Sequence, residues 1–145
     1  MDFEIRMCRR RDFQSVLRLL QQLWPGRELD SDALQKVFER GLRSKSQVYL
    51  CAENKDAVIG FVSLTVKNNL WQAANLGHID ELVVDEKHRG SGLGTRLLTA
   101  IAAQARQRGC VRVELESAFH RKKAHAFYER HGFENRGYLF SKPLQ

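Results

Sequence analysis

Hydrophobic residues change their spacing along the chain, and each change predicts a different element of secondary structure. In residues 3–7 they alternate with charged residues, a period of two that is typical of a half-buried strand. In residues 13–24 they recur every three or four positions, which indicates an amphipathic helix, and Asp12 stands at its expected N-cap. Pro25 and Gly26 then end this helix.

The same patterns continue to the end of the chain. Helices are expected at residues 13–24, from about 30 to 42, 93–105 and about 120–131. Strands are expected at residues 3–7, 47–53, 57–66, 79–84, 110–117 and 138–144, with one more starting at Gly132. Residues 54–56 read as a hairpin turn and residues 67–75 as a polar loop. This order predicts an α/β fold in a single domain covering residues 1–145, with a mixed central β-sheet flanked by about four helices.

Composition limits the classes of protein that fit. A chain of 145 residues can bury the core of one domain. It has no apolar run of the roughly 20 residues that a membrane span requires, and its first residues lack the apolar core of an export signal. The three cysteines, Cys8, Cys51 and Cys110, form no C-x-x-C motif, so we expect small buried side chains, no metal site and a reducing cytoplasm. We also expect no membrane partner.

Charge is unevenly distributed along the chain. Residues 1–85 carry 12 Lys+Arg and 12 Asp+Glu, whereas residues 86–145 carry 12 Lys+Arg and 5 Asp+Glu, which gives the net charge of +7. A basic second half indicates an anionic partner, either nucleic acid or a polyphosphate cofactor, or else simply a solvated basic face. We expect no nucleic acid, because no stripe of interleaved aromatic and basic residues lies outside the segment 120–131.

Three glycines separate the strand at residues 79–84 from the helix at residues 93–105. Gly90, Gly92 and Gly94 let the backbone approach a ligand closely, and the amides at a helix start attract anions. Thr95 and Arg96 would add a hydroxyl group and a cation. The spacing matches neither the dinucleotide-binding G-x-G-x-x-G motif nor a Walker A loop.

Two ordered motifs together resemble a known family. Residues 89–94 read R-x-x-G-x-G after V-V-D-E-K-H, and residues 124–133 read A-H-A-F-Y-E-R-H-G-F. This pairing resembles the GNAT superfamily of acyl-CoA-dependent N-acetyltransferases, and it is most similar to the small-molecule branches that include aminoalkylphosphonate and aminoglycoside acetyltransferases. The resemblance implies a single-domain GNAT-like fold, acetyl-CoA as cosubstrate, no metal and, as in many members, a homodimer.

The resemblance also implies which residues bind the cofactor. Residues 89–95 would cradle its pyrophosphate, and the backbone of residues 82–84 would bind the pantetheine arm. Some members place an asparagine after the next strand, but residues 117–119 read Ser-Ala-Phe here. Lys122 and Lys123 would either meet the 3′-phosphate or form a solvated face. The expected cofactor-binding residues are Leu82, Val83, Val84, Arg89, Gly90, Ser91, Gly92, Leu93, Gly94, Thr95 and Phe127.

Acetyl transfer to an amine needs a proton acceptor, because a free alkyl amine has a pKa of about 10. Glu81 is the candidate base by resemblance, and Asp80, His78, His125 or a water relay are the alternatives. Strand alternation predicts that Asp80 and Glu81 face opposite sides, so that only one faces the cleft. The resemblance also implies that Tyr128 is the acid that protonates the leaving sulfur; the alternative is a core aromatic.

The sequence therefore predicts an acetyl-CoA-dependent N-acetyltransferase that acetylates a primary amine of a small molecule by direct attack in a ternary complex. The alternatives are a protein lysine or N-terminal acetyltransferase and a non-catalytic CoA-binding regulatory module. An anionic acceptor would suit residues 120–123, and a cationic one would suit Glu28, Asp30 and Asp32. Trp71 is expected to cap the edge of the core, with a place in the acceptor pocket as the alternative.

Overall fold

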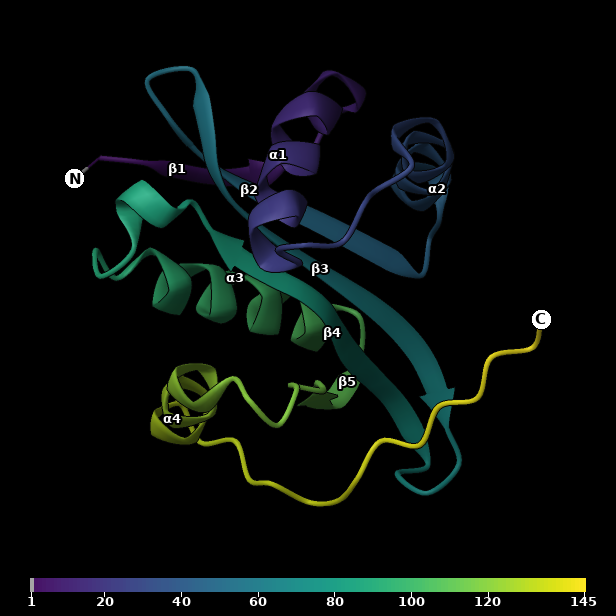
Figure 1. Ribbon diagram of the computed structural model, residues 1–145. Helices are drawn as coiled ribbons and strands as arrows, with labels where there is room; N and C mark the ends of the chain where they lie inside the picture. The colour runs from purple at the N-terminus through teal and green to yellow at the C-terminus, as the bar shows by residue number, and fades with distance from the viewer. Residues whose placement is uncertain (1) are drawn as a thin grey trace. The chain divides into compact units, whose positions relative to one another are not determined.

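The computed structural model describes residues 2–145, and its centre is a five-stranded sheet in the order β1-β2-β3-β4-β5 (Figure 1). The first four strands pair antiparallel, and β4 pairs parallel with β5. The chain forms two compact units, one ending at Glu114 and the other running from Leu115 to Gln145. The strands are β1 (Glu4–Met7), β2 (Gln47–Asn54), β3 (Ala57–Asn69), β4 (Ala74–Val84) and β5 (Cys110–Glu114).

Three α-helices belong to the first unit and one to the second. They are α1 (Phe13–Leu23), α2 (Ser31–Arg43), α3 (Leu93–Gln107) and, in the second unit, α4 (Lys122–Arg130). Short 3-10 helices, η1 (Arg10–Asp12) and η2 (Glu86–His88), precede α1 and α3. Across residues 2–145 no helix combines the length and the apolar character that crossing a membrane requires.

Helix α3 covers one face of the sheet, and α1 and α2 cover the other (Figure 1). Gly60 allows the close approach of α3, because a Cβ atom there would lie 2.9 Å from a methyl carbon of Leu97. The next residue of β3, Phe61, points to the opposite face and belongs to the core cluster with residues of α1 and α2. The residues of α3 that the sheet buries recur at helical spacing: Leu93, Leu97, Leu98, Ile101 and Ala105.

Aromatic rings fill the core between α1, α2 and the sheet. The Phe38 ring stacks on Tyr49 at 5.4 Å between centroids and is tilted against Phe13 at 5.6 Å. Tyr49 in turn meets Phe61 edge-on at 5.7 Å. Each such pair adds about 0.5–1.5 kcal/mol beyond area burial, so this row fixes α2 on the sheet.

Two irregularities in the ladders of β4 create the features that matter for the site. First, Ser63 pairs with Glu81 while Leu64 pairs with Ile79, so Asp80 is an extra residue, a β-bulge. Second, the β4–β5 ladder runs from Asn75 only to His78, whereas β4 continues to Val84. Within residues 2–145, no strand therefore pairs with the β5 side of β4 beyond His78.

The single-sheet α/β prediction is confirmed, but several boundaries differ. Strands β3 and β4 extend into the predicted loop, leaving only residues 70–73 between them, and Trp71 is 87% exposed rather than capping the core. Asp12 makes no side-chain cap bond to α1, because its carboxylate binds Arg6 instead. The strands expected after Gly132 are absent. A strand needs a ladder partner, and no described ladder includes residues 132–145.

Candidate active site

The glycine loop leads into the first turn of α3. Gly92 is the N-cap residue with φ +83°, and Gly90 has φ +82°, conformations that side chains with a Cβ rarely adopt. A Cβ atom at either position would meet nothing within 4 Å, so open space faces both residues. Because Gly92 has no side-chain oxygen, it offers the first turn of α3 no capping acceptor. An anion at this helix start would supply that acceptor.

Asp85 anchors the loop where β4 ends. Its carboxylate accepts hydrogen bonds from Gln22 Nε2 of α1 at 2.9 Å and lies 2.9 Å from His88 Nδ1. These hydrogen bonds, that of Gln22 first, lower the pKa of the Asp85 carboxyl. Gln22 Oε1 also accepts the backbone N–H of Glu86 at 2.9 Å. Helix α1 therefore holds the chain segment that leads into the glycine loop.

Two other predicted loop residues use their side chains to bind backbone carbonyls close by in the chain. Arg89 Nε donates to the carbonyl of Val84 at 3.2 Å, and Ser91 Oγ donates to the carbonyl of His88 at 2.6 Å. Leu93 is 1% exposed, so only its backbone can face a ligand. Gly94 and Thr95 lie in the first turn of α3. Arg96, expected to add a cation, instead places its guanidinium 4.4 Å from the centre of the Phe3 ring.

Leu82, Val83 and Val84 lie on the part of β4 that extends beyond the β5 ladder. On their other side all three pair with β3, where Val83 faces Phe61. Val83 is buried in the core cluster with α1 and α2, whereas Leu82 and Val84 are half-buried. Pairing with β3 therefore holds these three residues in an extended conformation. On the side of β5 they have no strand partner within residues 2–145.

Glu81 is the most deeply placed carboxylate of β4. Ser63 Oγ, which is fully buried, donates to Glu81 Oε1 at 2.5 Å and accepts the backbone N–H of Glu81 at 2.9 Å. Burial raises the pKa of the Glu81 carboxyl, and the hydrogen bond from Ser63 opposes this in part. The side chain shares the face of Val83, which looks toward α1 and α2.

The β-bulge overturns the expectation that Asp80 and Glu81 face opposite sides. Asp80 Oδ2 accepts a hydrogen bond from Thr65 Oγ1 at 2.6 Å, and Asp80 Oδ1 lies 2.6 Å from His78 Nδ1. Thr65 lies two residues after Ser63 on β3, hence on the same face. Both carboxylates therefore bind partners on one face, because the extra residue breaks the alternation. His78 and Asp80 form a partly exposed pair beside the more buried Glu81.

Tyr128 and Phe127 lie on α4 in the second unit. Their rings meet edge-on at 5.4 Å, and Tyr128 meets Phe133 in the same way at 5.6 Å. Burial raises the pKa of the Tyr128 phenol, so this group carries its proton at neutral pH. His125 Nε2 lies 2.9 Å from the carbonyl oxygen of Ala118, which joins the helix to the preceding loop.

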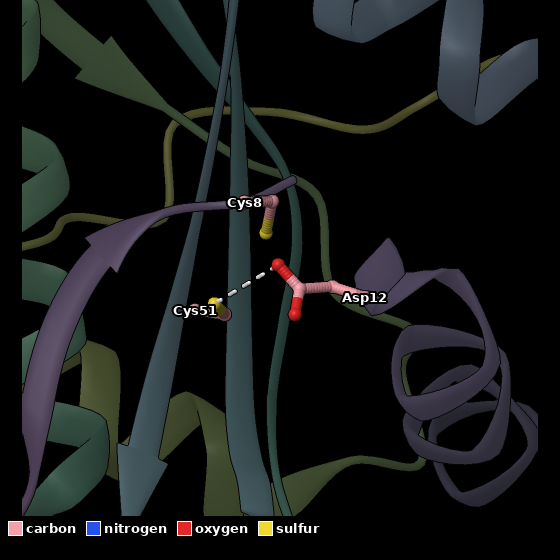
Figure 2. Close-up of side chains that lie close together, drawn as sticks. All are labelled: Cys8, Asp12 and Cys51. Atoms are coloured by element: carbon pink, nitrogen blue, oxygen red, sulfur yellow. Dashed lines mark hydrogen bonds between the residues drawn. The ribbon is translucent and has the colours of Figure 1, made fainter. Parts of the chain in front are cut away.

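A buried cluster of Cys8, Asp12 and Cys51 was not predicted. Figure 2 shows both sulfurs and the carboxylate pointing toward one another from the end of β1, the start of α1 and the middle of β2. Their ligand-type atoms all lie within 4.8 Å of one another. The hydrogen bond between the two cysteines raises the pKa of the Cys8 thiol and lowers that of the Cys51 thiol, so Cys51 is the more acidic of the two.

The chemistry of Asp12 favours an ion-pair network over a metal site here. Arg6 donates to both of its oxygens, at 2.9 and 3.1 Å, and the backbone N–H of Arg9 donates at 2.7 Å. Arg6 also binds Glu53 at 2.9 Å. The carboxylate is already neutralised by a cation, so an added metal ion would stand beside a guanidinium. The sequence alone does not reveal this cluster, because it depends on the register in which β1 pairs with β2.

Comparison with known proteins places this geometry in context. A model of the acetyltransferase (GNAT) family matches residues 13–133. The chain is 34% identical over 141 residues to an aminoalkylphosphonate N-acetyltransferase of Salmonella typhimurium, covering 97% of this chain and 91% of the relative. It is 30% identical over 135 residues to a glucosamine 6-phosphate N-acetyltransferase of Trypanosoma brucei brucei, covering 91% and 89%.

The fold is also shared with solved structures. An aminoglycoside N-acetyltransferase in complex with CoA superposes with a TM-score of 0.88 at 18% identity, over 99% of this chain and 96% of that one. The family model spans α1, the bulged β4, the glycine loop and α4, which are the elements that carry the features described above. From this match and from the relatives at 30% identity or more, the chain belongs to the acetyltransferase (GNAT) family.

Proposed function

We propose that this enzyme transfers the acetyl group of acetyl-CoA to a primary amine of a small molecule, by direct attack in a ternary complex. The observation that carries the proposal is the position of Glu81, a half-buried carboxylate on the segment of β4 that extends beyond the β5 ladder and leads into the glycine loop. The family match runs across the boundary between the two units at residue 114, which supports a single catalytic domain.

The glycine loop suits the pyrophosphate of CoA. Gly90 and Gly92 leave open space where any other residue would place a side chain, and the helix start attracts negative charge. The backbone of residues 82–84 has hydrogen-bonding groups on an edge without a strand partner in residues 2–145, which suits an extended amide-containing chain. When bound, acetyl-CoA supplies an acetyl group activated as a thioester.

Glu81 would act as the general base. The acceptor amine is mostly protonated at neutral pH and must lose a proton before its nitrogen can attack. Burial raises the pKa of Glu81 toward the working pH, which strengthens it as a base, and Ser63 fixes its position. His78 with Asp80 is the alternative acceptor, because the two form a hydrogen-bonded pair that is partly exposed to water.

Tyr128 would act as the general acid. As the C–S bond breaks, the leaving sulfur takes a proton, and a phenol with a raised pKa holds one to donate. Phe127, which packs against the Tyr128 ring, would contact the cofactor from α4. These roles on α4 rest on the family motif at residues 124–133.

Small-molecule amines are the proposed acceptors, because both named relatives at 30% identity or more act on such molecules. In both names the amine is joined to a phosphate or phosphonate group. The homodimer and the cytoplasmic location expected from the sequence stay predictions.

Thiol release from acetyl-CoA tests the proposal. The purified chain is incubated with acetyl-CoA and a panel containing an aminoalkylphosphonate, a phosphorylated amino sugar, an aminoglycoside and a lysine peptide. We expect release only when a small amine is present. Acetyl-CoA binding without release for any amine would favour the regulatory module, and release with the peptide alone would favour a protein acetyltransferase.

A further inference from the structure

A hollow of about 470 Å³ lies at the far end of α3 from the glycine loop. We call it the basic hollow and define it by three cationic and three neutral polar residues. These are Lys45, Lys67 and Arg108, together with Ser46, Asn68 and Asn75. Gly92 caps the first residue of α3 and Arg108 follows its last, so 15 residues, about 22 Å of helix, separate the two places.

The walls of the basic hollow are fixed by the sheet. The backbone N–H of Val66 donates to the carbonyl of Ser46 at 2.7 Å, and Asn68 pairs with Asn75 in the β3–β4 ladder. Asn75 Nδ2 donates to the carbonyl of Arg108 at 3.0 Å, which ties the end of α3 to the start of β4. The lining residues therefore come from strand ends and a helix end that are hydrogen-bonded to one another.

The segments that frame the basic hollow carry cations but no carboxylates of their own; Asp80 binds Thr65 at the far end of one of them. The framing segments 43–47, 65–76 and 104–112 contain no Asp or Glu. One ion pair lies at their margin, where Arg112 approaches Glu114 at 3.9 Å. Such a surface attracts anions, because no carboxylate within these segments competes for the cations. Their Lys and Arg residues are Arg43, Lys45, Lys67, Arg106, Arg108 and Arg112.

A helix C-terminus normally repels anions, because its last carbonyls carry partial negative charge. Here donors of the chain engage several of these carbonyls. Arg108 donates from its backbone to Ala105 at 3.1 Å and from Nη1 to the carbonyl of Gln104 at 3.3 Å. Gly109 donates to Arg106 at 3.0 Å, and Asn75 binds the carbonyl of Arg108. These carbonyls are therefore already bound by donors of the chain, and the cations stand beside them.

We propose that the basic hollow binds small polyphosphate anions, at a site separate from the glycine loop. Three cations from three segments match the charge of two or three linked phosphates better than that of one. Ser46, Asn68 and Asn75 add neutral hydrogen-bond donors, which favour phosphate oxygens. The proposal does not depend on acetyl transfer, since no residue of the site is shared with the glycine loop.

NMR titration of the full chain with tripolyphosphate tests the proposal. The reporters are the side-chain amides of Asn68 and Asn75, because residues 89–95 contain no asparagine. We expect both amides to shift, and the double substitution Lys45→Gln/Lys67→Gln to weaken the affinity about tenfold, since two partly exposed ion pairs each contribute modestly. The control Lys36→Gln/Lys55→Gln removes two exposed charges elsewhere and should leave the affinity unchanged.

Three results would overturn the proposal. One is a set of shifts confined to residues 89–95, which would assign all binding to the glycine loop. Another is equal affinity of the Lys45→Gln/Lys67→Gln variant and the parent chain. The third is a shift of Asn68 and Asn75 with duplex DNA but none with tripolyphosphate. Lys67→Arg keeps the charge and should retain binding, which separates loss of charge from loss of structure.

Discussion

Ser63 forms two hydrogen bonds with Glu81: its hydroxyl group donates to the carboxylate at 2.5 Å and accepts the backbone N–H of the same residue at 2.9 Å. The two residues pair across β3 and β4, next to the bulge at Asp80. Ser63 positions the carboxylate, and its hydrogen bond lowers a pKa that burial raises. It is therefore the most direct point at which to test the proposed base.

Ser63→Ala should move the acidic limb of the kcat profile to higher pH. Burial raises the pKa of Glu81 and the Ser63 hydrogen bond lowers it, so removing the hydroxyl raises the pKa further. A base works only when deprotonated, hence the rise in activity occurs at a higher pH. The control Thr65→Val removes a hydrogen bond to Asp80 and should leave the limb in place. A shift with Thr65→Val alone would point to Asp80 and His78 instead.

Glu81→Gln and Asp80→Asn form a matched pair that identifies the base. We expect Glu81→Gln to lower kcat by about 10²–10⁴, the range for losing a general base, without lowering the melting temperature, because it removes a half-buried charge. Asp80→Asn should lower kcat far less. Steady-state rates across pH and thermal unfolding of each variant provide the measurement. The opposite ranking of the two kcat losses would assign the base to the His78 and Asp80 pair.

Gly92→Ala should weaken acetyl-CoA binding by more than its loss of folding stability accounts for. Gly26 has the same φ of +83° and the same open surroundings, so Gly26→Ala is a matched control. Each substitution forces a left-handed conformation on alanine and should cost about 1–2 kcal/mol of stability. Only Gly92→Ala places a methyl group in the proposed pyrophosphate cradle. Calorimetric titration with acetyl-CoA is the measurement. Equal affinity of the two variants would contradict the assignment of the pyrophosphate site to Gly92.

Tyr128→Phe should lower kcat while leaving the affinity for acetyl-CoA almost unchanged. The ring keeps its contacts with Phe127 and Phe133, and only the proton donor is lost. Tyr138→Phe is the control, because that ring is 77% exposed and lies outside any helix or strand. The rate of thiol release with a saturating amine is the measurement. Equal rates for the parent chain and Tyr128→Phe would remove this residue as the acid.

Arg6→Gln should destabilise the first unit in a pH-dependent way. Burial is the largest single influence and raises the pKa of Asp12. The hydrogen bonds from Arg6 and from the Arg9 backbone, together with the charges of Arg6 and Arg11, outweigh it and leave that pKa lowered. Because the pKa of Asp12 is lower in the folded chain than in the unfolded chain, where it is about 4, the ionised carboxylate stabilises the fold above pH 4. This stabilisation is lost as the pH falls from there through the folded-state pKa. Removing the partner of a buried carboxylate costs about 3–5 kcal/mol. Denaturant unfolding should show a large gap from the parent at pH 7 that narrows below pH 4; a constant gap would contradict this account.

Local patterns were enough to predict most elements of the first unit. The apolar spacing of residues 93–105 gave α3, and the turn at residues 54–56 appears as Lys55 and Asp56 with φ of +49° and +67°. Helix α2 begins at Ser31, close to the predicted start near residue 30, and Asp30 caps it by accepting the backbone N–H of Ala33 at 3.1 Å. These features depend on neighbours in the sequence, so the sequence alone carries the information.

Features that depend on registry between strands were not predictable in this way. The bulge that turns Asp80 and Glu81 to one face arises from the pairing of β3 with β4, not from either strand alone. Likewise, Cys8 and Cys51 meet because β1 and β2 pair in one particular register. Asp12 looked like a helix cap because its contact with Arg6 depends on that same packing.

The double hydrogen bond of Gln22 has a consequence for inhibition. By binding Asp85 and Glu86, this side chain links α1 to the chain segment that leads into the glycine loop. If the glycine loop binds acetyl-CoA as proposed, a compound that displaces α1 would weaken this binding without occupying the place of either reactant.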